Sequence, residues 1–589
     1  MQFVINEMIG LDKIRPPASI PGPRYRPRLF GSVLEEAAKL ASDVLGPLNK
    51  TGDRQGARLT VDGVIAADGF KDAYRQFTEG GWNGLALPSE FQGQGLPELL
   101  ATAVQEMWNS SNLAFALCPL LTAGAVEAIL VHGSAEQKAL YLNKMVSGQW
   151  TGTMNLTEPQ AGSDLSAVRT RAVPEGDHYR IFGQKIFITW GDHDVAENIV
   201  HLALARTPNA PEGVKGISLF IVPKFLPNPD GSPGQRNDVR CASLEHKLGI
   251  HASPTCVMAY GDHDGAIGYR VGEENQGLAY MFTMMNEARL KVGLEGLSVA
   301  ERAYQQARDH AKTRVQGRPV GVKHGERVTI IHHPDVRRML MTMKSQVEAM
   351  RAFCYAVAEV MDIARHHPDR GARQHAQATV DLLIPVVKGW CTEVGVELAS
   401  LGIQVHGGMG FIEETGAAQT LRDARIITIY EGTTGIQAAD LAGRKLTMDG
   451  GQTMRALVSA MRDFNDEALA KTDGDDIAAI RRAFTVGIGA LSAASEWMIH
   501  TMNRDPNAAL AASTPYLMLA GYVCGGWQMA RAAVVAKDKL AQGDNSGFYQ
   551  AKLITARFYM EQILPKASAL LMTVTNAGAT TLALAEEQF

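Results

Sequence analysis

The sequence predicts a mainly α-helical protein that carries one β domain in its middle. Helical patterns dominate residues 1–152 and return after residue 272. Between them, residues 153–272 contain short apolar runs rich in β-branched residues and separated by glycine and proline, which is typical of strands and turns. An alanine-rich stretch from Arg455 to Phe589 follows the linker TMDGGQTM and predicts an additional C-terminal helical domain.

The length and charge balance are those of a large soluble protein. The chain has 589 residues, is 46% hydrophobic and 20% charged, and carries a formal net charge of −5. This length favours three or four domains with ample core. The near-neutral balance gives no electrostatic reason to expect binding to nucleic acid or to an anionic membrane surface.

Cysteine spacing and the N-terminus indicate a reducing compartment. The six cysteines lie far apart and form neither a metal-ligand cluster nor a disulfide framework. The N-terminus has acidic residues early and no apolar core long enough for a signal peptide. No uninterrupted apolar run approaches the roughly 20 residues that a membrane-spanning helix needs. We therefore expect a cytoplasmic protein without a metal and without a membrane span.

Local signals mark several helix ends. Ser32 stands before an amphipathic run and is expected to cap its helix. Ser134 and Gln137 have the spacing of a capping box, and Gly148 is expected to end that helix. Pro334 begins a long helix with apolar residues at spacings of three and four, and residues 283–315 predict another.

In the β region, HYRIFGQKIFIT alternates apolar and polar residues around Gly183. Alternation interrupted by a glycine indicates a β-hairpin with its turn at that glycine.

A lone carboxylate in the apolar run ITIYEGTTGIQAAD is a candidate functional residue. Glu431 is flanked by Ile427, Ile429 and Ile436. A carboxylate in such surroundings is costly unless it is paired or used in chemistry. From this run alone, a solvated turn glutamate remains the alternative.

Three motifs together resemble the acyl-CoA dehydrogenase family of flavoenzymes over roughly residues 80–447. They are TEPQAGSD, GQKIFITWG and IYEGTTGIQ, in the family's order and spacing. The resemblance implies an N-terminal helical domain, a middle β-barrel or sandwich and a C-terminal four-helix bundle. Applied to this chain, the domains are 1–152, 153–272 and 273–447, with the additional helical domain at 452–589.

Within that family, the length, the segment KLGIHASPTC and the additional C-terminal block are most similar to long bacterial members of the 3-methylmercaptopropionyl-CoA dehydrogenase type. Such a member would act in fatty acid metabolism or in dimethylsulfoniopropionate degradation.

The resemblance implies an FAD site on the first motif. Thr157 and the backbone amides around Leu156 would hydrogen-bond the edge of the isoalloxazine ring. Gly162 and Ser163 would let the backbone approach the flavin pyrophosphate and the CoA arm of the substrate.

The second motif would cover the flavin. The family expects an aromatic residue two positions before a threonine, which here are Phe187 and Thr189, with the threonine near flavin N5. The common pattern has tryptophan first and asparagine after the threonine, whereas this chain has Phe187 and Trp190. Which of the two aromatic rings lies against the flavin stays open.

Further positions imply an oligomer with shared cofactor sites. Gln404 and Gly408 match a loop that binds the adenosine part of the FAD held by a partner subunit, and Arg314 matches an arginine that reaches the same cofactor. The resemblance therefore implies a homodimer or a larger homo-oligomer. Thr433 is also placed among the cofactor-binding residues.

In the family, the glutamate of the third motif removes the α-proton of the thioester, so Glu431 is the expected base. Its backbone N–H would bind the thioester oxygen, and Gly432, the next residue, is also placed among the substrate-binding residues. A minority of members places the base next to the arginine matched by Arg289, but that position is Ala288 here. Glu287 is adjacent and points about 100° away on a helix. We expect Arg289 to supply a positive charge near Glu431.

The leading function is thus an FAD-dependent acyl-CoA dehydrogenase that forms a trans-2-enoyl-CoA and passes electrons to an electron-transfer flavoprotein. Its substrate would be 3-methylmercaptopropionyl-CoA or another short or medium acyl-CoA. An acyl-CoA oxidase that uses oxygen is the first alternative. A DNA-associated alkylation-response flavoprotein is the second, although Gly451–Phe589 holds 12 basic and 13 acidic residues, and DNA binding normally needs a basic surface.

Overall fold

The computed structural model describes residues 1–10 and 27–589, so part of the N-terminal stretch considered above lies outside the described residues. The chain divides into two compact units. One unit comprises Val33–Lys291, and the other comprises Met1–Ser32 together with Val292–Phe589. Each unit has its own secondary structure and core and is described separately below.

Helices begin the first unit. They are α1 (Pro27–Lys39), which continues as a π-helix over Leu40–Leu45, α2 (Gly46–Gln55), α3 (Phe70–Glu79), α4 (Glu98–Ser111), α5 (Leu113–His132) and α6 (Ala135–Val146), with the short hairpin β1 (Arg58–Thr60) and β2 (Gly63–Ile65). The prediction that Ser32 caps a helix is wrong, because α1 already begins at Pro27, a residue that suits a first helical turn. The capping box at α6 is confirmed: Ser134 accepts a hydrogen bond from the Gln137 amide, and the Gln137 side chain accepts one from the Ser134 amide.

Within residues 1–10 and 27–589, two helices have the length and apolar composition of a membrane span. They are Leu113–His132, with mean hydropathy 2.0, and Asp475–Arg504, with mean hydropathy 1.3. The sequence analysis overlooked the first. Because 78% of its most apolar window is buried within the protein, α5 behaves as a core helix of the first unit.

An eight-stranded sheet forms the β region of the first unit. Its strands are β3 (Trp150–Asn155), β4 (Arg171–Glu175), β5 (His178–Thr189), β6 (Asn198–Ala205), β7 (Ser218–Pro223), β10 (Val239–Leu244), β11 (Thr255–Tyr260) and β12 (Ala266–Val271). The order is β10-β11-β5-β12-β7-β6-β3, with β4 paired to β5, and only β3 and β6 run parallel. A separate small hairpin joins β8 (Phe225–Pro227) to β9 (Pro233–Arg236).

The predicted hairpin at Gly183 is wrong. β5 is one continuous strand through this glycine, whose space is closed by Thr170, since a Cβ there would lie 2.5 Å from the Thr170 Oγ1. The hairpin turn lies earlier, at Gly176 and Asp177, between β4 and β5. A Gly-Asp pair with positive φ at the glycine is a typical two-residue hairpin loop.

Long helices build the second unit. α7 (Gly277–Thr313) runs into it from the first unit, and α8 (Pro334–His366), α9 (Arg370–His406), α10 (Ala417–Ala424) and α11 (Thr434–Asp440) follow. Pro334 is the first residue of α8, as predicted. The apolar positions of α8, including Met343, Val347 and Met350, are buried, so its methionine-rich stripe is core.

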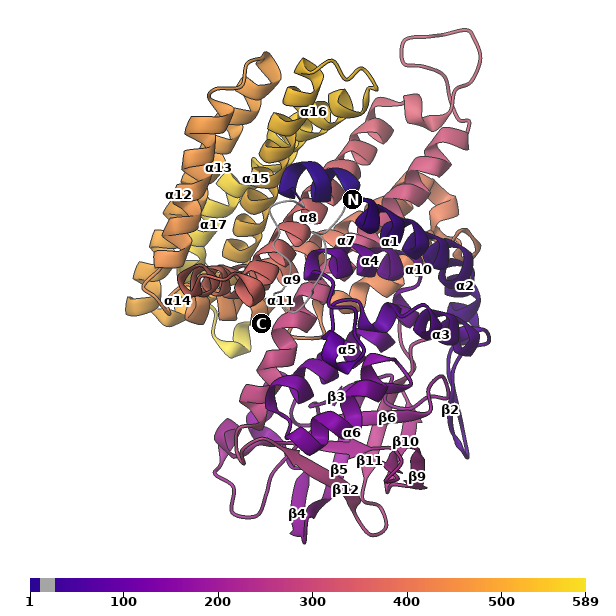
Figure 1. Ribbon diagram of the computed structural model, residues 1–589. Helices are drawn as coiled ribbons and strands as arrows, with labels where there is room; N and C mark the ends of the chain where they lie inside the picture. Colours follow the sequence, from indigo (N-terminus) through magenta and orange to yellow (C-terminus); the bar gives the residue numbers. More distant parts are fainter. Residues whose placement is uncertain (11–26) are drawn as a thin grey trace. The chain divides into compact units, whose positions relative to one another are not determined.

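The C-terminal helices pack on this bundle. They are α12 (Gln452–Phe464), α13 (Asp475–Arg504), α14 (Pro506–Ala511), α15 (Ser513–Ala541), α16 (Phe548–Phe558) and α17 (Lys566–Thr581), shown orange to yellow in Figure 1. α15 contacts both α8 and α9. Gly521 and Gly525 of α15 lie against the fully buried Trp390 of α9, and a Cβ on Gly521 would stand 2.1 Å from the indole. The glycines thus allow a close helix–helix approach.

Gly521→Val should destabilise the protein, because the added side chain has no room beside Trp390. Overpacking of this kind costs about 1–3 kcal/mol. Gly489→Ala is the matched control: it lies within α13 with no atom within 4 Å of its Cβ position, and removing a helical glycine gains about 0.5–1 kcal/mol. Urea unfolding followed by circular dichroism measures both. Equal midpoints for Gly521→Val and the unmodified protein would contradict the packing argument.

Candidate active site

The first predicted flavin motif leaves the sheet at the end of β3 and is fastened to β5. The Leu156 carbonyl accepts a hydrogen bond from the Lys185 ammonium at 3.1 Å, and the Thr157 carbonyl accepts one from the Ile186 amide at 2.9 Å. Two sequence motifs that lie about 30 residues apart are therefore side by side in the fold.

A buried ion pair joins these two motifs. Glu158 is 3% exposed and Lys185 is fully buried, and their charged atoms lie 2.8 Å apart. The Glu158 carboxylate also accepts hydrogen bonds from the Arg169 amide and from the amide and hydroxyl of Thr170. Burial alone would raise the pKa of Glu158, but Lys185 and these donors lower it to about 2. Burial lowers the pKa of Lys185 to about 8, so both groups are charged at pH 7.

The structure distinguishes the two aromatic candidates of the second motif. Trp190 is 1% exposed, stacks near Phe70, and its indole N–H donates to the Ala114 carbonyl at 3.0 Å. Phe187 is 59% exposed. A ring that is locked in a core cannot cover a cofactor, so of these two only Phe187 has a face free for a flavin.

A β-bulge directs Phe187 outward. The pairing of β5 with β11 shifts between Lys185 and Ile188, and Phe187 within this bulge has φ +59°. A bulge bends the strand and redirects a side chain. Positive φ in a bulky residue costs on the order of 1–3 kcal/mol and is found mainly at functional positions.

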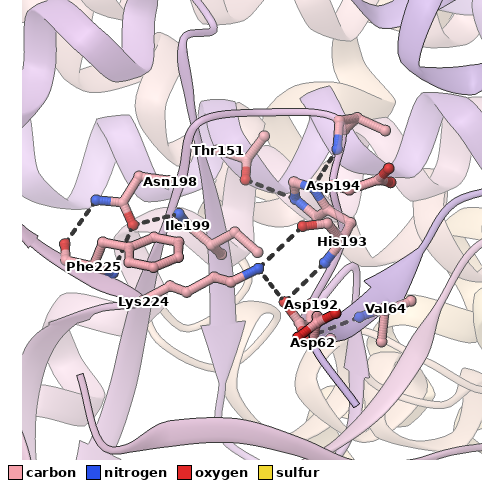
Figure 2. A network of polar contacts seen from close by, with 12 residues as sticks. Asp62, Val64, Thr151, Asp192, His193, Asp194, Asn198, Ile199, Lys224 and Phe225 are labelled. Atoms are coloured by element: carbon pink, nitrogen blue, oxygen red, sulfur yellow. Dashed lines mark hydrogen bonds and ion pairs between the residues drawn. The ribbon is translucent and has the colours of Figure 1, made fainter. Parts of the chain in front are cut away.

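A buried polar network secures the loop after Trp190 (Figure 2). Asp192 accepts hydrogen bonds from the Lys224 ammonium at 2.6 Å and from the Val64 amide at 3.2 Å. The Val195 amide donates to His193 Nδ1, so His193 Nε2 carries the proton and donates to the Thr151 hydroxyl at 2.9 Å. Burial and the nearby Lys224 lower the pKa of His193 well below its usual value, so it is neutral. The sequence analysis missed this network, although the cluster GDHD was a visible signal.

The predicted phosphate turn is open. Glu158 and Ala161 exchange backbone hydrogen bonds at 3.0 Å, and Gly162 and Ser163 follow on the surface. No atom lies within 4 Å of a Cβ position on Gly162, so a ligand can approach its backbone. Thr189, at the end of β5, is partly exposed.

In the second unit, Glu431 lies in a tight turn that precedes α11. Glu431 has φ +52° and Gly432 has φ +87°. The Lys388 ammonium donates to the Gly432 carbonyl at 2.7 Å, and the Gln437 side chain donates to the Glu431 carbonyl at 3.2 Å. Thr433 caps α11 through its hydroxyl, which accepts from the Ile436 amide. Glu431 is partly exposed, so its strained backbone is fixed while its side chain remains accessible.

A second carboxyl adjoins this turn and was missed by the sequence analysis. Glu295 of α7 is fully buried and accepts a hydrogen bond from the Tyr430 hydroxyl. Burial raises its pKa to about 8. A single glutamate in the helical segment VGLEGLS carried no pattern that would have indicated this contact.

The other residues proposed near the base have defined surroundings. Arg289 of α7 is 3% exposed, and Ala288 beside it is buried and offers no carboxyl. Glu287 pairs with Lys291 one turn later, which neutralises its charge. The role of Arg289 as a positive charge near Glu431 stays a prediction.

The structure brings together the residues predicted to reach a partner's cofactor. The rings of His310 and His406 stack with centroids 4.5 Å apart, so the C-terminal ends of α7 and α9 lie side by side. Arg314 follows α7, Gln404 lies in the last turn of α9, and Gly408 follows that helix; all three are exposed.

The residues of the first unit fit a flavin. They provide an exposed aromatic ring at Phe187, a backbone edge at Leu156 and Thr157, and an open glycine turn for a pyrophosphate. These are the three elements that a planar ring with a diphosphate tail requires: a surface to stack on, hydrogen-bonding groups, and close access to backbone N–H groups.

Four family models match successive parts of the chain. The acyl-CoA dehydrogenase N-terminal domain matches residues 33–149, the middle domain 153–262 and the C-terminal domain 275–446. The model described as "Acetyl-CoA dehydrogenase C-terminal like" matches residues 454–585, within the additional helical region.

Individual relatives agree with these matches. The chain is 50% identical over 553 residues to 3-methylmercaptopropionyl-CoA dehydrogenase of Ruegeria pomeroyi, covering 93% of this chain and 92% of that protein. It is 36% identical to a butyryl-CoA dehydrogenase of Syntrophomonas wolfei, covering 94% and 92%. The fold is similar to the crystal structure of acyl-CoA dehydrogenase complexed with FAD from Bacillus anthracis, with a TM-score of 0.75, 18% identity, and coverage of 96% and 90%. The chain therefore belongs to the acyl-CoA dehydrogenase family and is an FAD-dependent oxidoreductase that acts on the CH–CH bond of an acyl-CoA.

Proposed function

We propose that this protein dehydrogenates a short, unbranched acyl-CoA and that 3-methylmercaptopropionyl-CoA is its preferred substrate. The observation that carries the proposal is the 50% identity to the Ruegeria pomeroyi 3-methylmercaptopropionyl-CoA dehydrogenase over 93% of the chain. That likeness extends through the additional C-terminal region, which strengthens the assignment to this branch of the family.

In the proposed reaction, Glu431 is the base. Its carboxylate takes the α-proton, and the electron pair of the broken C–H bond forms the Cα–Cβ double bond as hydride leaves the β-carbon. The turn at Glu431 and Gly432 presents backbone to the thioester oxygen, on which negative charge develops. The hydrogen bonds from Lys388 and Gln437 support this role because they hold the turn without using the Glu431 carboxylate.

FAD, when bound, supplies the hydride acceptor. Thr157 and the backbone of Leu156 would hold the edge of its ring, and Phe187 and Thr189 would contact the ring from β5. Ser163 and Gly162 would hold the pyrophosphate and the CoA arm. The buried pair of Glu158 and Lys185 supports this assignment, because it keeps the two flavin motifs in fixed register.

A matched pair of substrates tests the proposal. 3-Methylmercaptopropionyl-CoA and pentanoyl-CoA have acyl chains of the same number of heavy atoms and differ by one sulfur in place of a methylene. We expect both to bleach the flavin under nitrogen, with the sulfur compound faster, and octanoyl-CoA and isobutyryl-CoA to be slower by tenfold or more. Fastest bleaching by octanoyl-CoA or isobutyryl-CoA would contradict the substrate assignment.

We also propose that the electron acceptor is an electron-transfer flavoprotein and that the protein is cytoplasmic. A reducing location is supported by the six cysteines, which are all free and buried: Cys118, Cys241, Cys256, Cys354, Cys391 and Cys524. Reoxidation of the substrate-reduced enzyme in air, with and without the flavoprotein, tests the acceptor. Rapid formation of hydrogen peroxide without the flavoprotein would instead identify an oxidase.

We further propose a homodimer or larger oligomer with shared cofactor sites. Arg314, Gln404 and Gly408 support it, because they are exposed and gathered at adjoining helix ends. Sedimentation should give at least a dimer, and Arg314→Ala should lower FAD occupancy, with exposed Arg318→Ala as the control. A monomer that retains one tightly bound FAD per chain would contradict the shared sites.

A further inference from the structure

The turn that carries Glu431 rests on buried polar groups that the proposed reaction does not consume. We propose that Glu295 is a positioning residue for this turn: its carboxyl anchors the Tyr430 hydroxyl and thereby fixes the backbone on which Glu431 stands. This inference rests on the proposed role of Glu431 as the base.

The geometry places Glu295 directly behind the residue that precedes the base. Its Oε2 accepts the hydrogen bond from Tyr430, and its Oε1 has no hydrogen-bond partner among the described residues. A fully buried carboxyl with one unsatisfied oxygen destabilises a fold. Stability therefore does not explain why a carboxyl is buried here, whereas its contact with the turn that carries Glu431 indicates a functional role.

Close packing of two helices brings Glu295 and Lys388 to the same turn. A Cβ on Gly296 would lie 2.2 Å from the Cys391 carbonyl oxygen, and one on Gly293 would lie 2.9 Å from the Val387 carbonyl oxygen. α7 and α9 thus meet backbone to backbone at this level. Glu295 then contacts the turn through the Tyr430 side chain, while the fully buried Lys388 contacts it through the Gly432 carbonyl. The base lies between these two anchors in the chain.

The groups around Glu295 and its burial determine the pH at which its carboxyl loses a proton. The groups that face it are Lys388 from α9 and Tyr430 and Glu431 from the turn. Burial raises the pKa of Glu295 to about 8; Tyr430 and Lys388 act against this, and Glu431 adds to it. Glu295 is therefore neutral at pH 7 and becomes an anion above about pH 8. A negative charge on Glu295 repels the Glu431 carboxylate, so transfer of the substrate proton to Glu431 becomes more favourable. Proton abstraction should therefore accelerate, by on the order of threefold.

The test compares two replacements of Glu295 in the full-length, FAD-loaded protein. Flavin reduction by saturating 3-methylmercaptopropionyl-CoA is followed under nitrogen from pH 6 to pH 9.5, with pentanoyl-CoA as second substrate. Glu295→Gln keeps an acceptor for Tyr430 and removes the titration, so its rate at pH 7 should stay within about threefold of the unmodified rate, without the rise near pH 8. Glu295→Leu removes the acceptor and should slow flavin reduction tenfold or more, while acyl-CoA affinity changes less than threefold.

Three controls make the result decisive. Glu301→Gln changes another carboxylate of α7, which is partly buried and pairs with Arg351 at 2.8 Å, and should leave the rate per bound flavin unchanged. Tyr430→Phe keeps Glu295 but removes the anchoring hydroxyl, so it should reproduce the slower reduction, and it replaces Glu295→Leu if that variant does not fold. Glu431→Gln separates the two claims, because an active Glu431→Gln would refute the base itself.

The inference is overturned if Glu295→Leu and Tyr430→Phe both reduce flavin at the unmodified rate, or if the slower rate comes with an equal loss of acyl-CoA affinity. A persistent rise near pH 8 in Glu295→Gln would assign that titration to another group and overturns the inference as well.

Discussion

Glu431→Gln is expected to bring flavin reduction by a good acyl-CoA substrate almost to a halt. The amide is nearly isosteric with the carboxylate and leaves the backbone of the turn, with its hydrogen bonds from Lys388 and Gln437, in place. It cannot accept a proton. General-base catalysis is worth on the order of 10²–10⁴ in rate, and coupling of proton loss to hydride loss favours the upper end. Single-turnover flavin bleaching under nitrogen measures the effect.

Binding should survive the same substitution. FAD content should be normal, and an enoyl-CoA product should still perturb the flavin spectrum, because in the proposed reaction the thioester oxygen is bound by backbone rather than by the carboxylate. Glu287→Gln is the matched control on α7: that carboxylate already pairs with Lys291, so its loss should be much milder. Reduction of Glu431→Gln at close to the unmodified rate would show that the base lies elsewhere.

Glu158→Gln should cause the largest loss of stability. It leaves the fully buried Lys185 ammonium without its counter-charge, and breaking a buried pair from one side costs about 3–5 kcal/mol. The double variant Glu158→Gln with Lys185→Met should recover much of this loss, because no charge then remains buried. Because the pair fastens Leu156 and Thr157 to β5, the single variant should also bind FAD weakly.

The pH dependence has a defined direction. The pKa of Glu158 is lowered from 4.5 to about 2, so its stabilisation is complete above pH 4.5 and is lost as pH falls towards 2. The unmodified protein should therefore lose more stability between pH 7 and pH 4 than the double variant Glu158→Gln with Lys185→Met, in which neither group titrates, and urea unfolding measures both losses. Glu175→Gln, which breaks an exposed pair with Arg180 in the same sheet, should change stability little. Equal effects of both substitutions would contradict the importance of burial.

Strong local signals were sufficient to predict several helices. The Ser134 capping box and the start of α8 at Pro334 follow from hydrogen bonding and ring geometry within one turn, and both are confirmed. Gly183 shows the limit of such reasoning. Its local pattern suggested a turn, but pairing with neighbouring strands and contact with Thr170 keep it extended within β5.

In the candidate site, too, local sequence predicted some features and tertiary packing determined the others. Glu431 stood out as a lone carboxylate in an apolar run, whereas the resemblance to the family pointed to Thr157 and Phe187. The motifs could not choose between Phe187 and Trp190, since that choice depends on the core around Ala114. They also could not find Glu295, which reaches Tyr430 across 135 residues of sequence, because such a contact exists only after α7 packs beside the turn that precedes α11.

The insertion of Trp390 between the glycines of α15 has a consequence for protein engineering. A shortened enzyme made by ending the gene before α12 would expose the Trp390 indole, which is fully buried in the intact chain. A hybrid that exchanges the C-terminal helices for those of another protein must carry a matching glycine face or replace the tryptophan. The two sides of this contact should therefore be changed together, because the glycines of α15 make room for the tryptophan of α9.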